Sequence, residues 1–257
     1  MFNGDFERGN VSQWWGAQCA NTSPAKLLFT RGTITVQSEI VAQERYAARI
    51  DLPAASEPTA CEAVRKRTLD LSDEWYALEF RLPLDWREPS PTGWGAVIAQ
   101  LNYQAIWGPP LGIYAHADKV SLILQSGLCR PVGTPHPPGP GCANTSGPGG
   151  NLAPMYVIPK APALGVWHQV LLHVRWAANS SGLLQVFHRR RGAPAWRQRL
   201  NFRGKPTVQW TNTVPPDPGN TTLDKIGAYR GRSTAPLSLW HDNFCVATTR
   251  AAAESCF

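Results

Sequence analysis

The sequence lacks several features, and each absence excludes a class of protein. No stretch approaches ~20 uninterrupted apolar residues, which excludes a membrane-spanning helix. No Cys-x-x-Cys pair and no His/Cys cluster with zinc spacing is present, so a structural zinc site is not expected. Charged residues make up only 17% of the chain and hydrophobic residues 43%, a balance typical of a folded globular protein.

Helical periodicity is almost absent, and short strands take its place. Apolar runs alternate with polar positions and are separated by turn-forming residues; the chain has 22 Gly and 23 Pro. This spacing is typical of an all-β, two-sheet sandwich of the jelly-roll type. With no internal repeat or linker, residues 1–257 are expected to form one domain. The predicted strands are Thr33–Gln37, Tyr46–Leu52, Ala63–Leu69, Trp75–Leu82, Ala96–Tyr103, Leu111–Ala117, Val120–Gln125, Trp167–Trp176, Leu183–Arg189, Lys225–Tyr229 and Leu239–Thr248.

The charge balance is basic, with a formal net charge of +7 carried by 19 Arg and 6 Lys. Arginine binds carboxylates and phosphates through a planar fork, so the balance favours a polyanionic partner, either nucleic acid or an acidic polysaccharide. The alternative is that the charge only confers solubility. Nucleic acid is the weaker choice because the basic residues are scattered and no aromatic RNA-binding strand accompanies them.

Six scattered cysteines favour disulfides and an oxidising compartment. We expect Cys129 to pair with Cys142, Cys245 with Cys256 and, by what remains, Cys19 with Cys61. The first pair encloses most of residues 130–154, a long Pro/Gly-rich loop that is either a wall beside a binding cleft or a plain insertion. Met1 followed by Phe2-Asn3-Gly4-Asp5 is typical of a mature secreted start behind an added initiator, so secretion is expected.

Two strands place polar side chains on one face of a sheet. Gln100 and Asn102 are two residues apart, as are Arg65 and Arg67, so each pair is predicted to share a face. The amides could bind a sugar or a uronate carboxylate. The two guanidinium groups could hold an anion between them on the open side of the sheet. The alternative in both cases is an ordinary solvated strand face.

A third strand combines a lysine and a tyrosine around a glycine. Lys225, Gly227 and Tyr229 share one face, and the glycine between them would leave an open trough for a substrate. Arg230 and Arg232 add positive charge beside it, which is expected to lower the pKa of the phenol. A tyrosine in a strand is more often part of the core or its rim.

The segments that carry these residues occur in one order along nearly the whole chain. The ordered set resembles the bacterial and fungal polysaccharide lyases with a concanavalin A-like jelly roll, which include glucuronan lyases and are related to heparin lyase I and some alginate lyases. The strand with Tyr229 is similar to the family's strand with the catalytic tyrosine. Gln100 and Asn102 stand where the family has Gln-x-His. The matching segments are GDFERGNVSQW, VRKR, DEWYALEFRLPLDW, IAQLN, VWHQVLLHVRWAANSSG, DKIGAYRG and LWHDNF.

The resemblance implies β-elimination on a uronic-acid polymer by a protein that acts as a monomer. Such an enzyme neutralises the C5 carboxylate, removes the C5 proton and protonates the leaving O4. Arg65, Gln100 and Asn102 would neutralise the carboxylate, and Tyr229 would be the general acid. Lys225 would bind substrate or lower the phenol pKa. The expected substrate-binding residues are Lys225, Arg67, Tyr114, Arg230 and Arg232.

Two departures from the family pattern leave the base open. Asn102 replaces a histidine and cannot accept a proton at neutral pH, and Arg67 replaces a glutamate. In one alternative Tyr229 serves as both base and acid in a syn elimination. In another, His116, predicted to share a face with Tyr114, replaces the lost base. In a third the protein is not catalytic and is a carbohydrate-binding module or lectin. A glycoside hydrolase is disfavoured because no strand carries the needed pair of carboxylates.

The two ends of the chain suggest a structural cation. In jelly-roll carbohydrate-active domains, an opening like Gly4-Asp5-Phe6-Glu7 often pairs with a closing strand like the one around Asp242, and their carboxylates share Ca²⁺. Glu7 and Asp242 would be ligands here, with Asp5 or backbone carbonyls completing the shell. The alternative is that all three are turn or hydrogen-bonding residues. No organic cofactor is expected.

Overall fold

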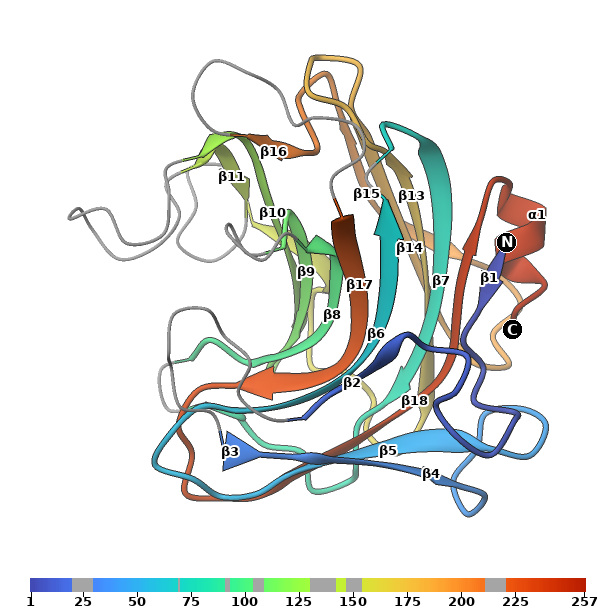
Figure 1. Ribbon diagram of the computed structural model, residues 1–257, viewed down its shortest axis with the longest axis vertical. Helices are drawn as coiled ribbons and strands as arrows, with labels where there is room; N and C mark the ends of the chain where they lie inside the picture. Colours follow the sequence, from blue (N-terminus) through green and yellow to red (C-terminus); the bar gives the residue numbers. More distant parts are fainter. Residues whose placement is uncertain are drawn as a thin grey trace.

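A computed structural model describes residues 1–19, 30–68, 70–90, 93–103, 109–129, 142–146, 154–210 and 221–257. The chain folds into two packed β-sheets with one short helix, α1 (Arg250–Glu254), near its end (Figure 1). Within the described residues no helix is long and apolar enough to span a membrane. The all-β sandwich predicted from the spacing of apolar runs is confirmed.

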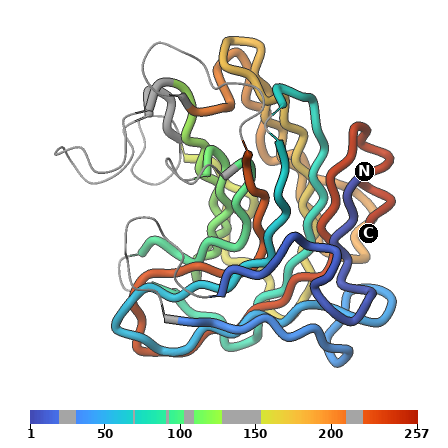
Figure 2. Tube along the Cα trace, in the orientation of Figure 1, coloured from blue at the N-terminus to red at the C-terminus, as the bar shows by residue number. Residues whose placement is uncertain are grey.

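Sheet I has eight strands and forms one layer of the sandwich. Its strands run in the order β15 (Arg197–Arg203), β14 (Leu183–Arg190), β13 (Trp167–Arg175), β7 (Asp73–Arg81), β18 (Leu237–Ala247), β5 (Ala47–Leu52) and β4 (Thr33–Gln37), with β1 (Phe2–Asn3) paired to β18. The β1–β18 pairing brings the first and last parts of the chain together, and the two termini lie on the same side of the molecule (Figure 2).

Sheet II has ten strands and forms the second layer. Its order is β11 (Cys142–Ser146), β10 (Val120–Cys129), β9 (Leu111–Ala115), β8 (Ala96–Tyr103), β17 (Thr221–Arg230), β6 (Thr59–Thr68) and β2 (Gly16–Gln18); β12 (Met155–Ile158) and β16 (Gln209–Trp210) pair with β10, and β3 (Thr30–Arg31) with β6. Figure 1 shows that sheet II curves away from sheet I. We call its surface on the far side from sheet I the concave face.

The core lies between the two sheets and follows from strand alternation. On β17, Ile226 and Ala228 point inward, while Lys225, Gly227 and Tyr229 occupy the alternate positions. The side chains that fill the space from sheet I come from the same alternation along β7, β13, β14 and β18. Once the inward residues of a strand are known, the residues between them can be placed on the concave face.

Two predicted disulfides are present. Cys19 is bonded to Cys61, and Cys245 to Cys256. Each closes a loop of the unfolded chain and so stabilises the fold, by a typical ~2–4 kcal/mol per bond. Cys129 and Cys142 are opposed in the β10–β11 register, but their side chains lie outside the described residues.

The predicted strands all appear, and several are longer than the apolar pattern indicated. β6 begins four residues earlier than expected, and β10 extends four residues further. The prediction of an uninterrupted loop over residues 130–154 is wrong in one part, because β11 lies within it; most of the rest lies outside the described residues. The consecutive predicted strands β13 and β14 form a hairpin, with eight residue pairs in register.

Candidate active site

Three strands bring polar side chains together on the concave face. Ala63 and Ile226 belong to the core, so alternation turns the adjacent Glu62 and Lys225 to the concave face. Gln100 is the register partner of Lys225 and joins them. The Gln100 amide donates a short hydrogen bond to the Glu62 carboxylate, and the Lys225 ammonium lies 3.7 Å from the same carboxylate. All three side chains are buried, which strengthens their mutual electrostatics.

Tyr229 lies on the same face, two residues beyond Gly227. Its ring packs against a small apolar cluster of Val97, Tyr114 and Ile123. Burial, reinforced by the negative charge of Glu62, raises the pKa of Tyr229. The phenol therefore keeps its proton at neutral pH, and the expectation that nearby arginines lower its pKa is wrong.

Tyr114 stands beside Tyr229 and is almost fully buried. Burial raises the pKa of its phenol, and the neighbouring Tyr229 and Glu62 raise it further. Tyr114, which was expected to bind substrate, therefore lies on the concave face in contact with Tyr229.

Gly227 has a structural role that differs from the one expected. A Cβ atom built on it would lie 2.3 Å from the Cys61 carbonyl oxygen and 2.6 Å from the Glu62 Cα atom. Both contacts are with backbone, which cannot move aside cheaply. Glycine is required because β17 and β6 approach closely there, and that approach sets Glu62 opposite Gly227, between Lys225 and Tyr229 along β17.

Arg65 and Arg67 share one face of β6, as predicted, but it is the inward face. The Arg65 guanidinium donates to the buried Asp224 carboxylate at 2.8 Å, and Arg67 lies 3.7 Å from it. Arg67 also donates to Glu74 and to the Tyr76 hydroxyl. The anion between the two arginines is thus a carboxylate of the protein itself, and the prediction that they hold a substrate on the open side is wrong.

Arg230 and Arg232 are likewise not beside the phenol. Arg230 is 2% exposed, and its guanidinium donates to the carbonyl oxygens of Pro53 at 2.9 Å and Ala235 at 2.6 Å. Arg232 lies beyond the end of β17 and is exposed. The expectation that Arg230 binds substrate fails because alternation turns it away from Tyr229.

Asn102 lies where β8 departs from regular pairing. Its φ is 56°, and the register with β17 shifts between Leu223 and Lys225. Its backbone N–H donates to the inward-facing Asp224 at 3.0 Å, so the alternation on which a shared face with Gln100 was predicted is interrupted. Both amide atoms of its side chain are buried, and neither has a hydrogen-bond partner among the described residues.

His116 borders the concave face near Tyr114. Its Nε2 atom lies 2.9 Å from the hydroxyl oxygen of Ser121, the register partner of Tyr114. Its Nδ1 atom lies 3.9 Å from the Glu88 carboxylate. Burial is the largest influence on its pKa, which is lowered, so the imidazole is neutral near pH 7.

Sequence reasoning missed Glu62. It was overlooked because β6 was predicted to begin at residue 63. The signal was available, since Cys61 and Ala63 are both small core residues and leave Glu62 on the opposite face.

The predicted calcium ligands come together only in part. Glu7 accepts from the backbone N–H groups of Arg45 and Tyr46, and Asp242 accepts from those of Ala42 and Gln43, so both carboxylates bind one loop. Burial raises the pKa of Asp242 to about 7; the two amides lower it, and the charges of Glu79 and Glu7 add to the rise.

The Oδ1 atom of Asp242 is buried and has no hydrogen-bond partner within the part of the chain that the structure describes. An unpartnered carboxylate oxygen near a second carboxylate suits a hard cation. Asp5 instead accepts from the Glu7 N–H, Asn3 and Gln13. Among the described residues, no group of three or more His, Cys, Asp or Glu is arranged to hold a metal.

Comparisons with known proteins identify the family of the chain. Residues 6–245 match the family model described as polysaccharide lyase. No curated protein matches the sequence of the chain.

Several solved structures share the fold at low sequence identity. Endo-β-1,4-glucuronan lyase from the fungus Trichoderma reesei has a TM-score of 0.64 and 19% identity, over 96% of this chain and 95% of that one. The marine PL-14 alginate lyase from Aplysia kurodai has a TM-score of 0.52 and 9% identity, over 84% and 87%. The cellulose-induced protein Cip1 has a TM-score of 0.51 and 12% identity, over 97% and 98%. At these identities the likeness concerns the fold.

Proposed function

Because this chain belongs to the polysaccharide lyase family, we propose that it cleaves a uronic-acid-containing polysaccharide of the glucuronan type by β-elimination on the concave face of sheet II. The observation that carries the proposal is that Glu62, Gln100, Lys225 and Tyr229 lie together on that face. The similar fold of a fungal glucuronan lyase and the net charge of +7 support an acidic polymer as substrate.

Tyr229 is the general acid of the proposed reaction. Its raised pKa keeps the phenol protonated, which suits a group that must donate a proton to the leaving oxygen. The same raised pKa disfavours the syn mechanism in which a phenolate also removes the C5 proton.

Glu62 is the base of the proposed reaction. Among the groups on this face, its carboxylate oxygens accept, whereas the Lys225 ammonium and the Gln100 amide are turned to it as donors. The Gln100 amide and the Lys225 ammonium hold the carboxylate in place. His116 is a weaker choice because its ring is engaged by Ser121 and lies near Glu88.

Gln100 and Lys225 also offset charge on the substrate. The C5 carboxylate gains negative charge as the proton leaves, and preorganised donors stabilise that charge in a site with little water. Lys225 faces both this carboxylate and Glu62, so its one positive charge limits the repulsion between them. Arg65 is excluded from this role because it is bonded to Asp224 on the inward face.

The bonds balance without a further reactant. Glu62 takes the proton from C5, the C5–H electron pair forms the C4–C5 double bond, and the C4–O4 bond breaks. The departing glycosidic oxygen takes the phenol proton of Tyr229 and becomes a new reducing end. The other product begins with a 4,5-unsaturated uronate, and exchange with water restores both protein groups.

A calcium ion at the chain ends is a second part of the proposal. Glu7 and Asp242 would hold it with backbone carbonyls, and the ion would join the opening segment to β18 without entering the reaction. The support is the unpartnered Oδ1 atom of Asp242 and the raised pKa of that carboxyl.

Secretion is also part of the proposal. The Cys19–Cys61 and Cys245–Cys256 disulfides are typical of an oxidising compartment outside the cytosol. An enzyme that acts on a large polymer meets its substrate there.

The function is tested by ultraviolet absorbance of the unsaturated uronate on glucuronan, alginate and heparin. Glucuronan is expected to give the fastest rise. Glu62→Gln should lower the rate by about 10²–10⁴-fold, whereas Glu39→Gln, an exposed glutamate beyond β4, should not change it. Binding of polymers without any absorbance rise would instead indicate a carbohydrate-binding module.

A further inference from the structure

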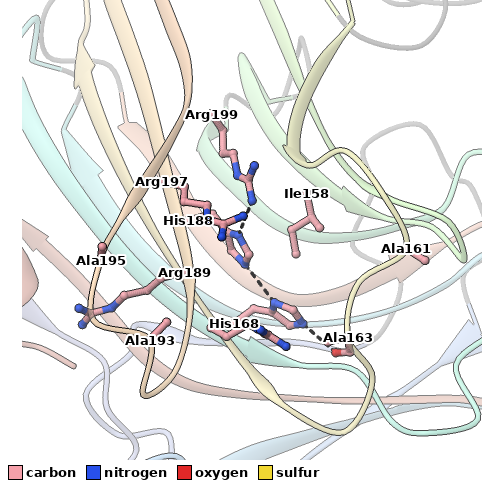
Figure 3. A pocket seen from close by; sticks show the side chains of 11 residues that line it. Ile158, Ala161, Ala163, His168, His188, Arg189, Ala193, Ala195, Arg197 and Arg199 are labelled. Atoms are coloured by element: carbon pink, nitrogen blue, oxygen red, sulfur yellow. Dashed lines mark hydrogen bonds between the residues drawn. The ribbon is translucent and has the colours of Figure 1, made fainter.

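A basic pocket, distinct from the candidate active site, lies at the edge of the sandwich. It is formed between β13–β15 of sheet I and the segment that follows β12. Its volume is about 270 Å³, just below the range of roughly 300–1,000 Å³ for small-molecule sites. Figure 3 shows that His168, His188, Arg197 and Arg199 gather there. The pocket lies on the core side of β13 and β14, because His168 and His188 are each two residues from an inward residue, Val170 and Val186, and so share its face. It is therefore separate from the concave face.

A chain of hydrogen bonds fixes the tautomers of both histidines. The Ala163 carbonyl lies 2.8 Å from His168 Nε2, so that nitrogen must carry the proton. Arg199, whose guanidinium can only donate, lies 3.5 Å from His188 Nδ1, so that atom accepts and His188 Nε2 carries the proton. His188 Nε2 therefore donates to His168 Nδ1, 3.0 Å away. Both rings are therefore neutral, and neither can take a second proton without losing a bond of the chain.

Among the described residues, no carboxylate pairs with the positive charges of Arg190, Arg197 and Arg199 in the pocket. The residues that line it include Arg190, Arg197 and Arg199 but no Asp or Glu. Within the described residues, none of these three arginines forms an ion pair, and the Nε atom of Arg199 is buried without a hydrogen-bond partner. Arg189 also lines the pocket, but its guanidinium already has partners: it donates to Gln169 and stacks on Trp196.

The pKa values of His188 and Arg199 reflect the positive charge gathered in the pocket. Burial is the largest cause that lowers the pKa of His188 to about 3, and the charges of the surrounding arginines lower it further. Burial and the charge of Arg197 lower the pKa of Arg199. Clustered guanidinium groups repel one another unless an anion lies between them.

We infer that this pocket binds one oxyanion group, a sulfate, a phosphate or a carboxylate, through the guanidinium forks of Arg197 and Arg199. Planar guanidinium groups match such oxygens with two parallel hydrogen bonds. The small volume suits a free inorganic anion or one charged sugar residue, and not a longer segment of polymer. The site does not depend on the proposed elimination, since none of its residues lies on the concave face.

The test is calorimetric titration of the whole chain with sodium sulfate, sodium phosphate and a glucuronan oligosaccharide, each at constant ionic strength set with sodium chloride. We expect saturable binding of at least one of them and a shift of the His188 ring resonances in NMR spectra. The Arg197→Gln/Arg199→Gln double variant should weaken binding by at least about tenfold. The charge-matched Arg8→Gln/Arg203→Gln variant alters exposed arginines elsewhere and should bind like the original chain.

The ligand that saturates the site identifies the source of the oxyanion. Saturation by sulfate or phosphate alone assigns a free anion, and saturation by the oligosaccharide that persists in the inactive Glu62→Gln variant assigns a second contact for the polymer. No saturable heat with any ligand, or equal binding by the two double variants, would overturn the inference. Unshifted His188 resonances at saturation would place the anion elsewhere and overturn it as well.

Discussion

The two faces of β6, β8 and β17 each carry a cluster of polar side chains. On the inward face, Asp224 receives hydrogen bonds from Arg65 and from the Asn102 backbone. On the concave face, the next residue, Lys225, meets Glu62. Both clusters are charged and buried, so burial and charge alone do not distinguish them.

The difference lies in the side of the sheet on which each cluster stands. The inward cluster continues from Arg67 to Glu74 and Tyr76, and it closes on core residues such as Trp176. The concave cluster stands on the curved surface of sheet II. A charge network closed within the fold stabilises it, whereas one that faces the exterior can act on a substrate.

Tyr229→Phe breaks the comparison most directly. The change removes only the phenol oxygen, so we expect kcat to fall by about 10²–10⁴-fold. The unfolding midpoint should stay close to that of the original chain because the ring keeps its packing. The measurement is the absorbance assay together with thermal unfolding. Tyr156→Phe on β12 is the matched control and should keep full activity; a Tyr229→Phe variant with full activity would remove the phenol from the mechanism.

Asp224→Asn tests the opposite face. Removal of one partner from a buried ion pair leaves Arg65 and Arg67 uncompensated, so the free energy of unfolding should fall by about 3–5 kcal/mol. Denaturant titration measures the loss. The exposed Asp118→Asn should change it by less than about 0.5 kcal/mol. If Asp224→Asn unfolds like the original chain but is inactive, the inward cluster is catalytic and the comparison fails.

The pH profile sharpens the distinction between acid and base roles of Tyr229. Its pKa is raised above the ordinary value of 10.0, and a general acid is active below its pKa and loses activity as pH rises through it. The alkaline decline of kcat should therefore begin above about pH 10. A phenolate base would give a rate that climbs over the same range. Rate measurements between about pH 6 and 11 separate the two.

The sequence predicted the strands well but not the faces. Alternation correctly placed Arg65 and Arg67 on one side of β6, yet the choice of side depends on which neighbours enter the core. The inward residues Cys61 and Ala63 decide it, and both are small enough to fit either face. The same ambiguity hid Glu62, the carboxylate that now completes the concave cluster.

Other features had no signal in the sequence. The register shift near Asn102 comes from the pairing of β8 with β17, which a single strand does not reveal. β15 (RQRLNFR) was missed because its residues are mostly polar; it is an edge strand held by backbone pairing to β14. The ordered motifs still led to the polysaccharide lyase family, since they span most of the chain.

Calcium offers a smaller effect at a third charged region, the chain ends. Because the folded pKa of Asp242 is about 7, against an ordinary value of 3.8, the folded chain holds this proton more tightly than the unfolded chain. Its contribution to stability is therefore full at low pH, falls as pH rises through this window and levels off above it. Calcium binds the ionised carboxylate, so it should raise the unfolding midpoint more at about pH 8 than at about pH 5.

The size of the calcium effect follows from mass action. At a hundredfold excess over Kd, the gain is about 2.7 kcal/mol. Thermal unfolding with calcium and then with a chelator measures it, and Asp242→Asn should abolish it whereas Asp118→Asn should not. An unchanged midpoint at the higher pH would contradict the calcium proposal.

Trp15→Ala should have the smallest effect and marks the edge of the concave face. Its ring is 62% exposed, and the ammonium of Lys66 lies 5.6 Å from the ring centroid. Lys66 lies on the same face of β6 as the concave-facing Glu62 and Val64, so the indole offers a flat surface where an extended polymer would leave the site. A contact made equally in the ground and transition states changes only KM, so we expect KM to rise about three- to tenfold with kcat unchanged. Trp94→Ala, at an equally exposed tryptophan, is the control and should leave KM as it is. A fall in kcat would instead bring Trp15 into the reacting geometry and extend the active face across β2.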